Sequence, residues 1–164
     1  EMGIERILLS GDNQETTASI AKECGINKFI ADALPQDKAR IIKELKKEYG
    51  ALAMVGDGIN DAPALKQADI GIALGQGADI AIESADIVIV TNKLELIPKA
   101  IKLSLATFQK IKQNLFWAFF YNVIAIPLAI FGALHPIIAE IAMAISSVTV
   151  VSNANLLRRE LRHL

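Results

Sequence analysis

Two acidic residues stand four positions apart among glycines in the string MVGDGINDAPAL, residues 54–65. Asp57 and Asp61 follow an apolar run directly, and no basic residue appears until Lys66. Negative charge at the end of a buried strand is costly unless a cation offsets it. Carboxylates at strand ends form a hard oxygen site of the kind that Mg²⁺ prefers, usually together with a phosphate. The pattern therefore predicts a site for Mg²⁺ and a phosphate group.

A second polar cluster, SGDN at residues 10–13, follows another apolar run. The Ser10 hydroxyl could donate to a phosphate oxygen, and Lys38 could neutralise phosphate charge. Gly56 and Gly58 would let the backbone approach an anion closely. The alternative interpretation is a glycine-rich turn with a solvated carboxylate, which GDG taken alone favours. The full twelve-residue string favours the phosphate site.

Strands and helices that must position these residues alternate along the chain from residue 1 to residue 92. Short apolar runs predict strands, and segments with helical periodicity predict helices. The predicted strands are ERILLS (5–10), ALAMV (51–55), DIGIAL (69–74) and ADIVIV (85–90), and the predicted helices are 13–25 and 35–50. This alternation predicts an α/β fold with a largely parallel sheet. Because ligands bind at the carboxyl ends of such strands, we expect both acidic clusters to face one crevice.

The remainder of the chain is apolar, and Glu140 is the only formally charged residue between residues 113 and 157. Residues 115–134 are long enough to span a hydrocarbon core of about 30 Å. Residues 136–152 are less apolar and are predicted to return as the second arm of a hairpin. Lysines before the first span and arginines after the second place both ends in the cytoplasm by the positive-inside rule. These are Lys99, Lys102, Lys110, Lys112, Arg158, Arg159 and Arg162.

Polar side chains recur at one depth of the two spans. Asn122 lies about seven residues, or ~10 Å, from the cytoplasmic start of the first span, and Ser147 lies about as far from the end of the second. Antiparallel helices would bring them to one level with their neighbours Tyr121 and Ser146. Met143 shares the helix face of the serines. The alternative interpretation is helix–helix packing, in which serine and asparagine bridge spans and methionine fills gaps.

Composition excludes several classes of protein. The net charge of −1 leaves no basic surplus to neutralise phosphates, which argues against a nucleic-acid binder. A single cysteine, Cys24, rules out an internal disulfide framework and a cysteine-only metal cluster. The chain opens on Glu1 without a start methionine, so we expect a piece of a longer protein.

The strings LLSGDN, LPQDK and MVGDGINDAPALKQADIGIALGQGADIAIESADIVIV resemble the second half of the phosphorylation domain of P-type ATPases. That domain belongs to the haloacid-dehalogenase-like superfamily, and the resemblance runs through essentially the whole chain. It implies that Asp57 is the Mg²⁺ ligand and that Asn60 hydrogen-bonds the phosphoryl group. Asp61 would support the same site.

The resemblance also implies roles for the other polar residues. Ser10 and Gly11 would contact the phosphate, Asp12 would lie near the nucleotide, ATP, and Lys38 would be the family's lysine. Ser10 replaces the usual threonine and keeps its hydroxyl. The nucleophile of the family, the aspartate of an Asp-Lys-Thr-Gly-Thr motif, does not occur in the sequence. We therefore expect this chain to be inactive alone.

The spans resemble the last two helices of the monovalent-copper-transporting P-type ATPases. Asn114, Tyr121-Asn122 and Pro127 have the spacing of the penultimate helix, and Met143-Ala-Ile-Ser146-Ser147 resembles the last one. The resemblance implies an intramembrane Cu⁺ site that includes Tyr121, Asn122, Met143, Ser146 and Ser147. A thioether is a soft ligand that suits Cu(I). The Cys-Pro-Cys of the family belongs to an earlier helix, and Glu140 departs from the small residue expected there.

We therefore expect the carboxy-terminal part of an ATP-driven Cu(I) export pump in a plasma or inner membrane. Four segments are predicted: half of a cytoplasmic phosphorylation domain, an amphipathic linker helix, two membrane helices and a basic cytoplasmic tail, at residues 1–92, 93–114, 115–157 and 158–164. The expected partners are the nucleotide-binding and actuator domains, the earlier membrane helices, the lipid bilayer and a copper chaperone, with no nucleic acid. The alternatives are a membrane-anchored phosphatase of the same superfamily, a non-catalytic remnant, and Ag⁺ or another heavy metal as cargo.

Overall fold

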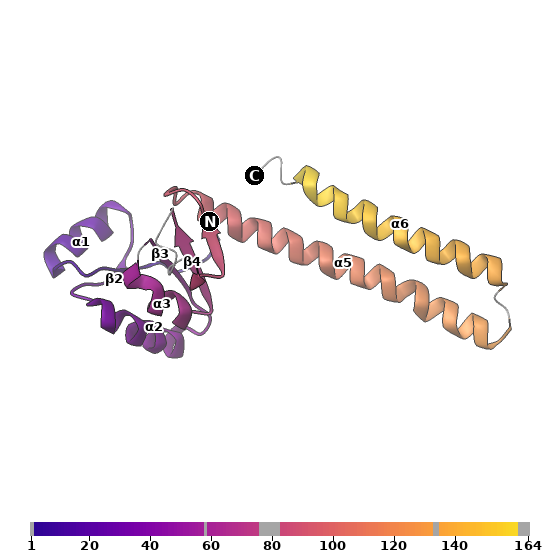
Figure 1. The fold of residues 1–164 in the computed structure, drawn as a ribbon, viewed down its shortest axis with the longest axis horizontal. Helices are drawn as coiled ribbons and strands as arrows, with labels where there is room; N and C mark the ends of the chain where they lie inside the picture. The colour runs from indigo at the N-terminus through magenta and orange to yellow at the C-terminus, as the bar shows by residue number, and fades with distance from the viewer. Residues whose placement is uncertain (1, 58, 76–82, 133–134, 161–164) are drawn as a thin grey trace. The chain divides into compact units, whose positions relative to one another are not determined.

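The computed structural model describes residues 2–57, 59–75, 83–132 and 135–160. The chain divides into two compact units, residues 1–94 and 95–164 (Figure 1). Gly58 of the glycine-rich string, Leu134 at the predicted end of the first span, and Arg162 of the predicted tail lie outside the described residues. So do the side chains of Arg158 and Arg159.

The first unit alternates strands and helices along the chain. Its elements are β1 (Ile7–Leu9), α1 (Gln14–Glu23), β2 (Lys28–Ile30), α2 (Pro35–Tyr49), β3 (Ala53–Gly56), the 3₁₀ turn η1 (Ile59–Asp61), α3 (Ala62–Gln67), β4 (Ile70–Leu74) and β5 (Ile87–Ile89). The ends of the helices have local causes. Asn13 caps α1 by accepting from the Thr16 N–H at 2.9 Å, and Pro35 opens α2 with a preset φ. Gly25 and Gly50, with positive φ, follow the two helices.

The strands are all parallel, which confirms the predicted α/β class, but they form two sheets among the described residues. β1 pairs with β2, and β3, β4 and β5 pair in that order. The sequence patterns did not predict β2, because a three-residue strand with one lysine shows too little periodicity.

One hydrophobic core supports the ends of both β1 and β3. Ile42 of α2, Met54 of β3, and Ala64 and Leu65 of α3 are buried together, and Leu9 of β1 packs against them. Leu9 directly precedes Ser10, and Met54 lies three residues before Asp57. The two polar clusters therefore follow strands that are anchored in the same core.

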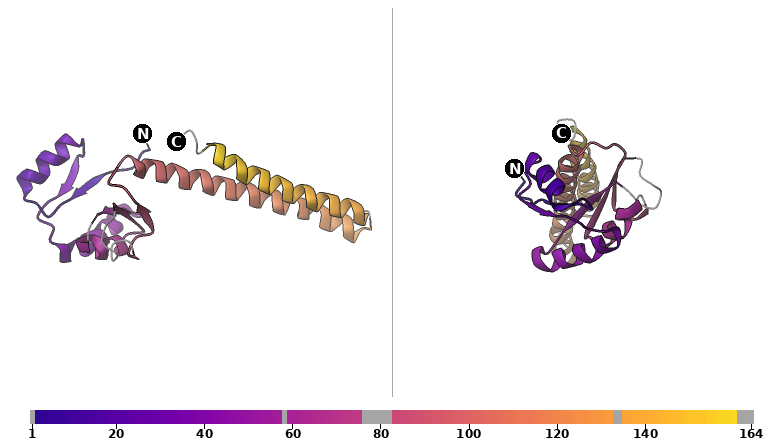
Figure 2. Two further views of the ribbon diagram at one scale, coloured as in Figure 1. Left: turned by 45° about the horizontal axis from the view of Figure 1, so that its top comes forward. Right: turned by 90° about the vertical axis from the view of Figure 1, so that its left-hand side faces the viewer.

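The second unit is a hairpin of two long helices, α5 (Leu96–Ile130) and α6 (Pro136–Glu160), which lie side by side in both Figure 1 and Figure 2. Both are long and apolar enough to cross a membrane. Most of the predicted linker and of the predicted first span forms one helix of 35 residues, which also runs through Pro127. No change of structure marks residue 115, because the lysine-bearing segment before it and the apolar segment after it both continue the helix.

Candidate functional site

Asp57 and Asn60 lie where β3 ends, and both are exposed. The chain leaves β3 at Gly56 and enters η1, which ends at Asp61. Asp61 is 8% exposed and belongs to the buried polar residues of the unit. The two acids of the glycine-rich string therefore occupy different environments, one open to solvent and one inside the fold.

Lys38 and Asp61 form a short, largely buried ion pair. Lys38 Nζ donates to Asp61 Oδ1 at 2.6 Å, and the two side chains are 15% and 11% exposed. Lys38 comes from the start of α2, so the pair ties this helix to the turn after β3. Gly56 makes room for the pair, because a Cβ at this position would lie 2.7 Å from Cβ of Asp61. An ammonium group is thereby held near the end of β3.

Ser10 and Asp12 form a second pair at the end of β1. Ser10 Oγ donates to Asp12 Oδ2 at 2.8 Å, and the Asp12 N–H donates to Ser10 Oγ at 3.2 Å. The loop after β2 supports their backbone, since the Ala33 N–H donates to the Ser10 carbonyl at 3.0 Å and the Asp32 N–H to the Asp12 carbonyl at 2.8 Å. Gly11 lies between them, with space for a Cβ at 3.4 Å from the Ala33 oxygen.

Asp32 is a residue that sequence reasoning missed. Its φ of 52° lies in the left-handed region, which residues other than glycine rarely adopt. Aspartate tolerates this conformation better than most side chains, and the two backbone hydrogen bonds of the loop hold it there. No signal in the sequence marks Asp32 apart from other loop aspartates.

The structure brings Lys38 to Asp61 and Ser10 to Asp12, and it leaves Asp57 and Asn60 at the surface. Among the described residues, no group of three or more His, Cys, Asp or Glu side chains could hold a metal ion. Mg²⁺ needs fewer protein ligands, because it binds through one or two carboxylates together with phosphates and water. The exposed carboxylate of Asp57, with the Asn60 amide three residues on, fits that donor set.

A further ion pair braces the opposite end of β3. Lys46 Nζ lies 2.9 Å from Asp69 Oδ1, and the Leu52 N–H donates to Asp69 Oδ2 at 2.9 Å. The hydrogen bond from Lys46, followed by that from the Leu52 backbone, lowers the pKa of Asp69 below the ordinary carboxyl value. The brace joins α2 to the strands that carry the acidic cluster.

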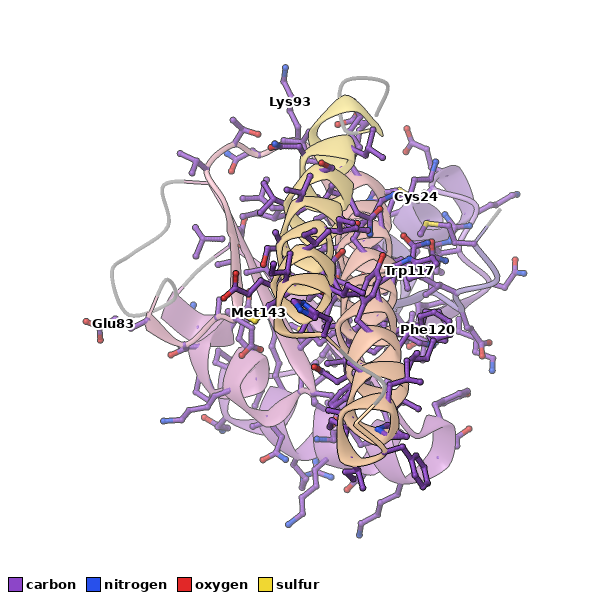
Figure 3. The ribbon with its side chains drawn as sticks, turned by 90° about the vertical axis from the view of Figure 1, so that its right-hand side faces the viewer. Cys24, Glu83, Lys93, Trp117, Phe120 and Met143 are labelled. Atoms are coloured by element: carbon purple, nitrogen blue, oxygen red, sulfur yellow. The ribbon has the colours of Figure 1, made fainter. Side chains whose placement is uncertain are left out.

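In the hairpin, the five predicted copper residues fall into two groups. Tyr121 and Ser146 are half-buried, and they lie on the faces that the two helices turn toward each other. Asn122, Met143 and Ser147 are exposed, and Met143 is 75% exposed (Figure 3). The Asn122 amide donates to the Ala118 carbonyl at 2.9 Å, and the Ser147 hydroxyl donates to the Met143 carbonyl at 3.1 Å.

The three exposed residues share one flank of the hairpin. Asn122 follows Tyr121, Ser147 follows Ser146, and Met143 follows the half-buried Ala142. An antiparallel helix pair has an approximate two-fold axis perpendicular to the plane of the pair. In each helix, the residue that follows a facing residue is rotated by about 100° around the helix. Because of the two-fold axis, these following residues lie on the same side of the plane in both helices. The hairpin therefore presents an amide, a thioether and a hydroxyl on one side.

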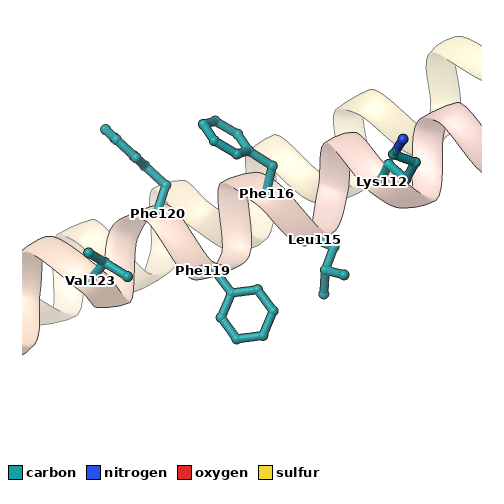
Figure 4. A pocket seen from close by; sticks show the side chains of 6 residues that line it. All are labelled: Lys112, Leu115, Phe116, Phe119, Phe120 and Val123. Atoms are coloured by element: carbon teal, nitrogen blue, oxygen red, sulfur yellow. The ribbon is translucent and has the colours of Figure 1, made fainter.

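A separate apolar hollow of ≈ 520 Å³ lies along α5 (Figure 4). It is lined by Lys112, Leu115, Phe116, Phe119, Phe120 and Val123. None of the predicted copper residues lines it, so the hollow and the predicted copper residues are separate features of the hairpin.

Comparisons with known proteins agree on one family. Residues 1–69 match the haloacid dehalogenase-like hydrolases. The chain is 56% identical over 158 residues to a protein of Staphylococcus haemolyticus strain JCSC1435 named copper-exporting P-type ATPase. It is 55% identical over 159 residues to the protein of the same name from Staphylococcus aureus strain JH9. These alignments cover 96% and 97% of this chain. The chain spans about a fifth of the length of both relatives.

A solved crystal structure of a zinc-transporting PIB-type ATPase is similar over 95% of this chain and 26% of its own, with a TM-score of 0.84 and 40% identity. The similarity covers the α/β unit and the helical hairpin together, since neither unit alone makes up that share of the chain. Over nearly its whole length the chain is therefore related to the heavy-metal P-type ATPases, as a haloacid dehalogenase-like part followed by two long apolar helices.

Proposed function

We propose that this chain is the carboxy-terminal part of an ATP-driven Cu(I) export pump. It would carry the metal and phosphate half of the phosphorylation site together with part of the intramembrane copper site. The observation that carries the proposal is the Lys38–Asp61 pair beside the exposed Asp57 at the end of β3. The names of the two staphylococcal relatives support the choice of copper.

In the phosphorylation site, Asp57 would hold Mg²⁺, which would neutralise charge on a transferring phosphoryl group. Lys38 is fixed by Asp61 and would bring its ammonium group to the same phosphoryl oxygens without reorganising. Ser10, held by Asp12 at 2.8 Å, would donate its hydroxyl, and Asn60 its amide. Preorganised donors of this kind supply most of the rate in phosphoryl transfer.

The arrangement of the strands fits a site that another segment completes. β1 and β3 are anchored in the same hydrophobic core, yet no described strand pairs with both of them. A parallel strand between them would end between Ser10 and Asp57. We infer that the intact pump supplies such a strand, with the aspartate nucleophile at its carboxyl end.

The copper site would likewise need a third contributor. Asn122, Met143 and Ser147 share one flank of the hairpin, and the Met143 thioether is the soft ligand among them. Tyr121 and Ser146 lie between the helices and would support this layer. An earlier helix bearing thiolates would dock on this flank and complete the coordination of Cu(I).

The placement in the cell follows from the membrane helices. The relatives of this chain are named P-type ATPases, and α5 and α6 are long and apolar enough to integrate it in a membrane. We infer that both ends of the hairpin are cytoplasmic, because Lys99, Lys102, Lys110 and Lys112 precede the predicted first span. The remaining pump domains and a copper chaperone would be the partners of the cytoplasmic unit.

The proposal is tested in the intact pump by Asp57→Asn, with Asp69→Asn as the matched control. Asp69 is an exposed aspartate of the same unit that lies at the far end of β3. Asp57→Asn should lower phosphoenzyme formation from labelled ATP and Mg²⁺ by orders of magnitude while copper binding persists, and Asp69→Asn should leave both in place. Normal phosphorylation of Asp57→Asn would show that the metal ligand lies elsewhere.

The same preparation also tests which ion is transported and whether the protein is a pump or a phosphatase. The wild-type pump should hydrolyse ATP in response to Cu(I) and not to Zn²⁺, the ion named for the zinc-transporting structure. Strong stimulation by Zn²⁺ would exclude copper as the cargo. Because the nucleophile is absent, the 164-residue chain alone should retain no acid-stable label from ATP. Release of phosphate by that chain with Mg²⁺ and without Cu(I) would favour the phosphatase alternative.

A further inference from the structure

Three side-chain hydrogen bonds between α5 and α6 converge on Asn153. Its Nδ2 donates to Asn114 Oδ1 at 2.8 Å and to Gln113 Oε1 at 3.2 Å. Its Oδ1 accepts from Lys110 Nζ at 3.4 Å. One amide of α6 therefore contacts three polar residues on successive turns of α5.

The short Asn114–Asn153 hydrogen bond defines the offset between the helices. In an antiparallel pair, each step forward along one helix is level with a step back along the other, at about 1.5 Å per residue. If Asn114 is level with Asn153, four further pairs of residues lie at matching heights. Every member of these pairs is half-buried. The four pairs are Lys110–Leu157, Ala118–Thr149, Tyr121–Ser146 and Ala125–Ala142.

The rest of this seam does little to fix that offset. Alanine, serine and threonine at three of the levels let the helices approach closely. Small side chains interlock weakly, so a shift of about one turn would bring Ala125 against Ala139 instead of Ala142 and keep a similar surface in contact. Ala139 is half-buried as well. A hydrogen-bonded residue at one level would disfavour that alternative, because the shift breaks its hydrogen bonds and leaves the half-buried Asn114 and Asn153 without each other as partners.

We propose that Asn153 is a positioning residue that sets the axial register of α6 against α5. Through this register it holds Tyr121 level with Ser146, and the Asn122, Met143 and Ser147 flank at one height. The register concerns the hairpin alone, whereas its consequence for copper rests on the function proposed above.

Paired cysteines in the 164-residue chain in phosphatidylcholine vesicles measure the register directly. Cys24, the only cysteine, is first replaced by serine. The pair Ala125→Cys with Ala142→Cys reports the native offset, and Ala125→Cys with Ala139→Cys reports a shift of about one turn. Both pairs lie ~16 Å or more from Asn153 along α6, so they report on the whole helix and not on the local contact. Disulfide formation is driven with diamide.

With Asn153 present, the native pair should cross-link at least tenfold faster than the shifted pair. Asn153→Leu should bring this ratio close to one. Asn155→Leu is the matched control, because Asn155 is an exposed asparagine two residues further along α6. It should leave the ratio unchanged. An unchanged ratio in Asn153→Leu would overturn the proposal, and so would loss of both cross-links, since Asn153 would then hold the helices together without setting their offset.

Asn114→Ala gives a second measurement of the cross-linking ratio. This measurement does not depend on whether Asn153→Leu inserts into the vesicle membrane. The substitution leaves Asn153 in place and removes its shortest hydrogen bond. The ratio should fall in the same direction, and an unchanged ratio would also overturn the proposal.

In the intact pump, Asn153→Leu should raise the Cu(I) concentration for half-maximal ATPase stimulation by about tenfold. Asn155→Leu should leave that concentration unchanged. Phosphorylation by inorganic phosphate, which does not require the copper layer, should stay near the wild-type level. An unchanged Cu(I) concentration in Asn153→Leu would contradict the consequence for copper. A wild-type pump that ignores Cu(I) would reject the proposed function, while the cross-linking result would still decide the register.

Discussion

Lys38 Nζ lies 2.6 Å from Asp61 Oδ1, although the two residues are separated by 23 positions in the sequence. Both side chains are largely buried, so each charge would be uncompensated inside the protein without the other. The pair therefore has a structural role in the α/β unit before any ligand is bound. It ties the start of α2 to the turn that follows β3.

Lys38→Met should destabilise the α/β unit by about 1–3 kcal/mol, because the Asp61 carboxylate keeps its burial and loses its counter-charge. Hydrogen exchange of the β3 amides in the full chain measures this free energy. The double variant Lys38→Met with Asp61→Leu should recover part of the loss, since an apolar pair can replace a buried ion pair at little cost. Additive losses in the double variant would contradict the coupling.

Gly56→Ala should destabilise the unit by about 1–3 kcal/mol, the usual cost of overpacking a core. The added Cβ would lie 2.7 Å from Cβ of Asp61 and 2.8 Å from its Oδ2, so the ion pair must move. Gly11→Ala is the control, because its Cβ meets only the Ala33 oxygen at 3.4 Å. Urea unfolding followed by hydrogen exchange compares the two. Equal losses would mean that the approach of Gly56 to Asp61 has no special role.

Met143→Leu separates packing from copper ligation. The substitution keeps volume and apolarity, and Met143 is 75% exposed in the hairpin, so it should cost under ~1.5 kcal/mol of stability. Loss of the thioether should remove high-affinity intramembrane Cu(I) and copper-stimulated ATPase activity in the intact pump. Copper stoichiometry and turnover are the measurements, with Ile145→Leu as an exposed apolar control on α6. Full copper stimulation in Met143→Leu would leave this residue a packing role.

The Asp69 brace predicts a dependence of stability on pH. The pKa of Asp69 is lowered in the folded chain, so its contribution is complete above the ordinary carboxyl pKa of 3.8 and is lost as the pH falls through the folded value. Asp69→Asn should make the decrease of the free energy of unfolding with falling pH less steep below about pH 4. Lys46→Met should flatten it too, because it removes the largest cause of the shift. Unfolding profiles from about pH 2 to about pH 6 test both, and an unaltered slope in either variant would contradict the assignment.

The elements with strong patterns were predictable from the sequence, and the α/β class and the two apolar helices are confirmed. The strand DIGIAL appears as β4 with the expected burial, since an apolar run bounded by polar residues is a local signal. β2 was missed because its three residues carry no period. The division into two sheets depends on which strands can reach each other, which no local pattern contains.

The site was predictable as a set of residue types and less so as an arrangement. The string around Asp57 and Asp61 marked both acids alike, yet one is exposed and the other is paired with Lys38. That difference arises from packing between α2 and η1, far apart in the chain. The roles of Asp57 in binding Mg²⁺ and of Met143 in binding Cu(I) stay predictions, which the substitutions above test.

The continuity of α5 has a mechanical consequence. A helix of 35 residues is about 50 Å long, whereas the hydrocarbon core is about 30 Å thick, so about 20 Å of the same rod extends beyond it. Pro127, which lacks an N–H, lies beyond Asn122, so between Lys99 and Asn122 the helix has no break in its hydrogen-bonded backbone at which a displacement could be absorbed. Motion imposed on the first turns at Leu96 is therefore transmitted as tilt or axial translation to the level of Tyr121 and Asn122. In the proposed pump, the size of the movement that reaches the membrane would then be set by leverage along one rigid helix.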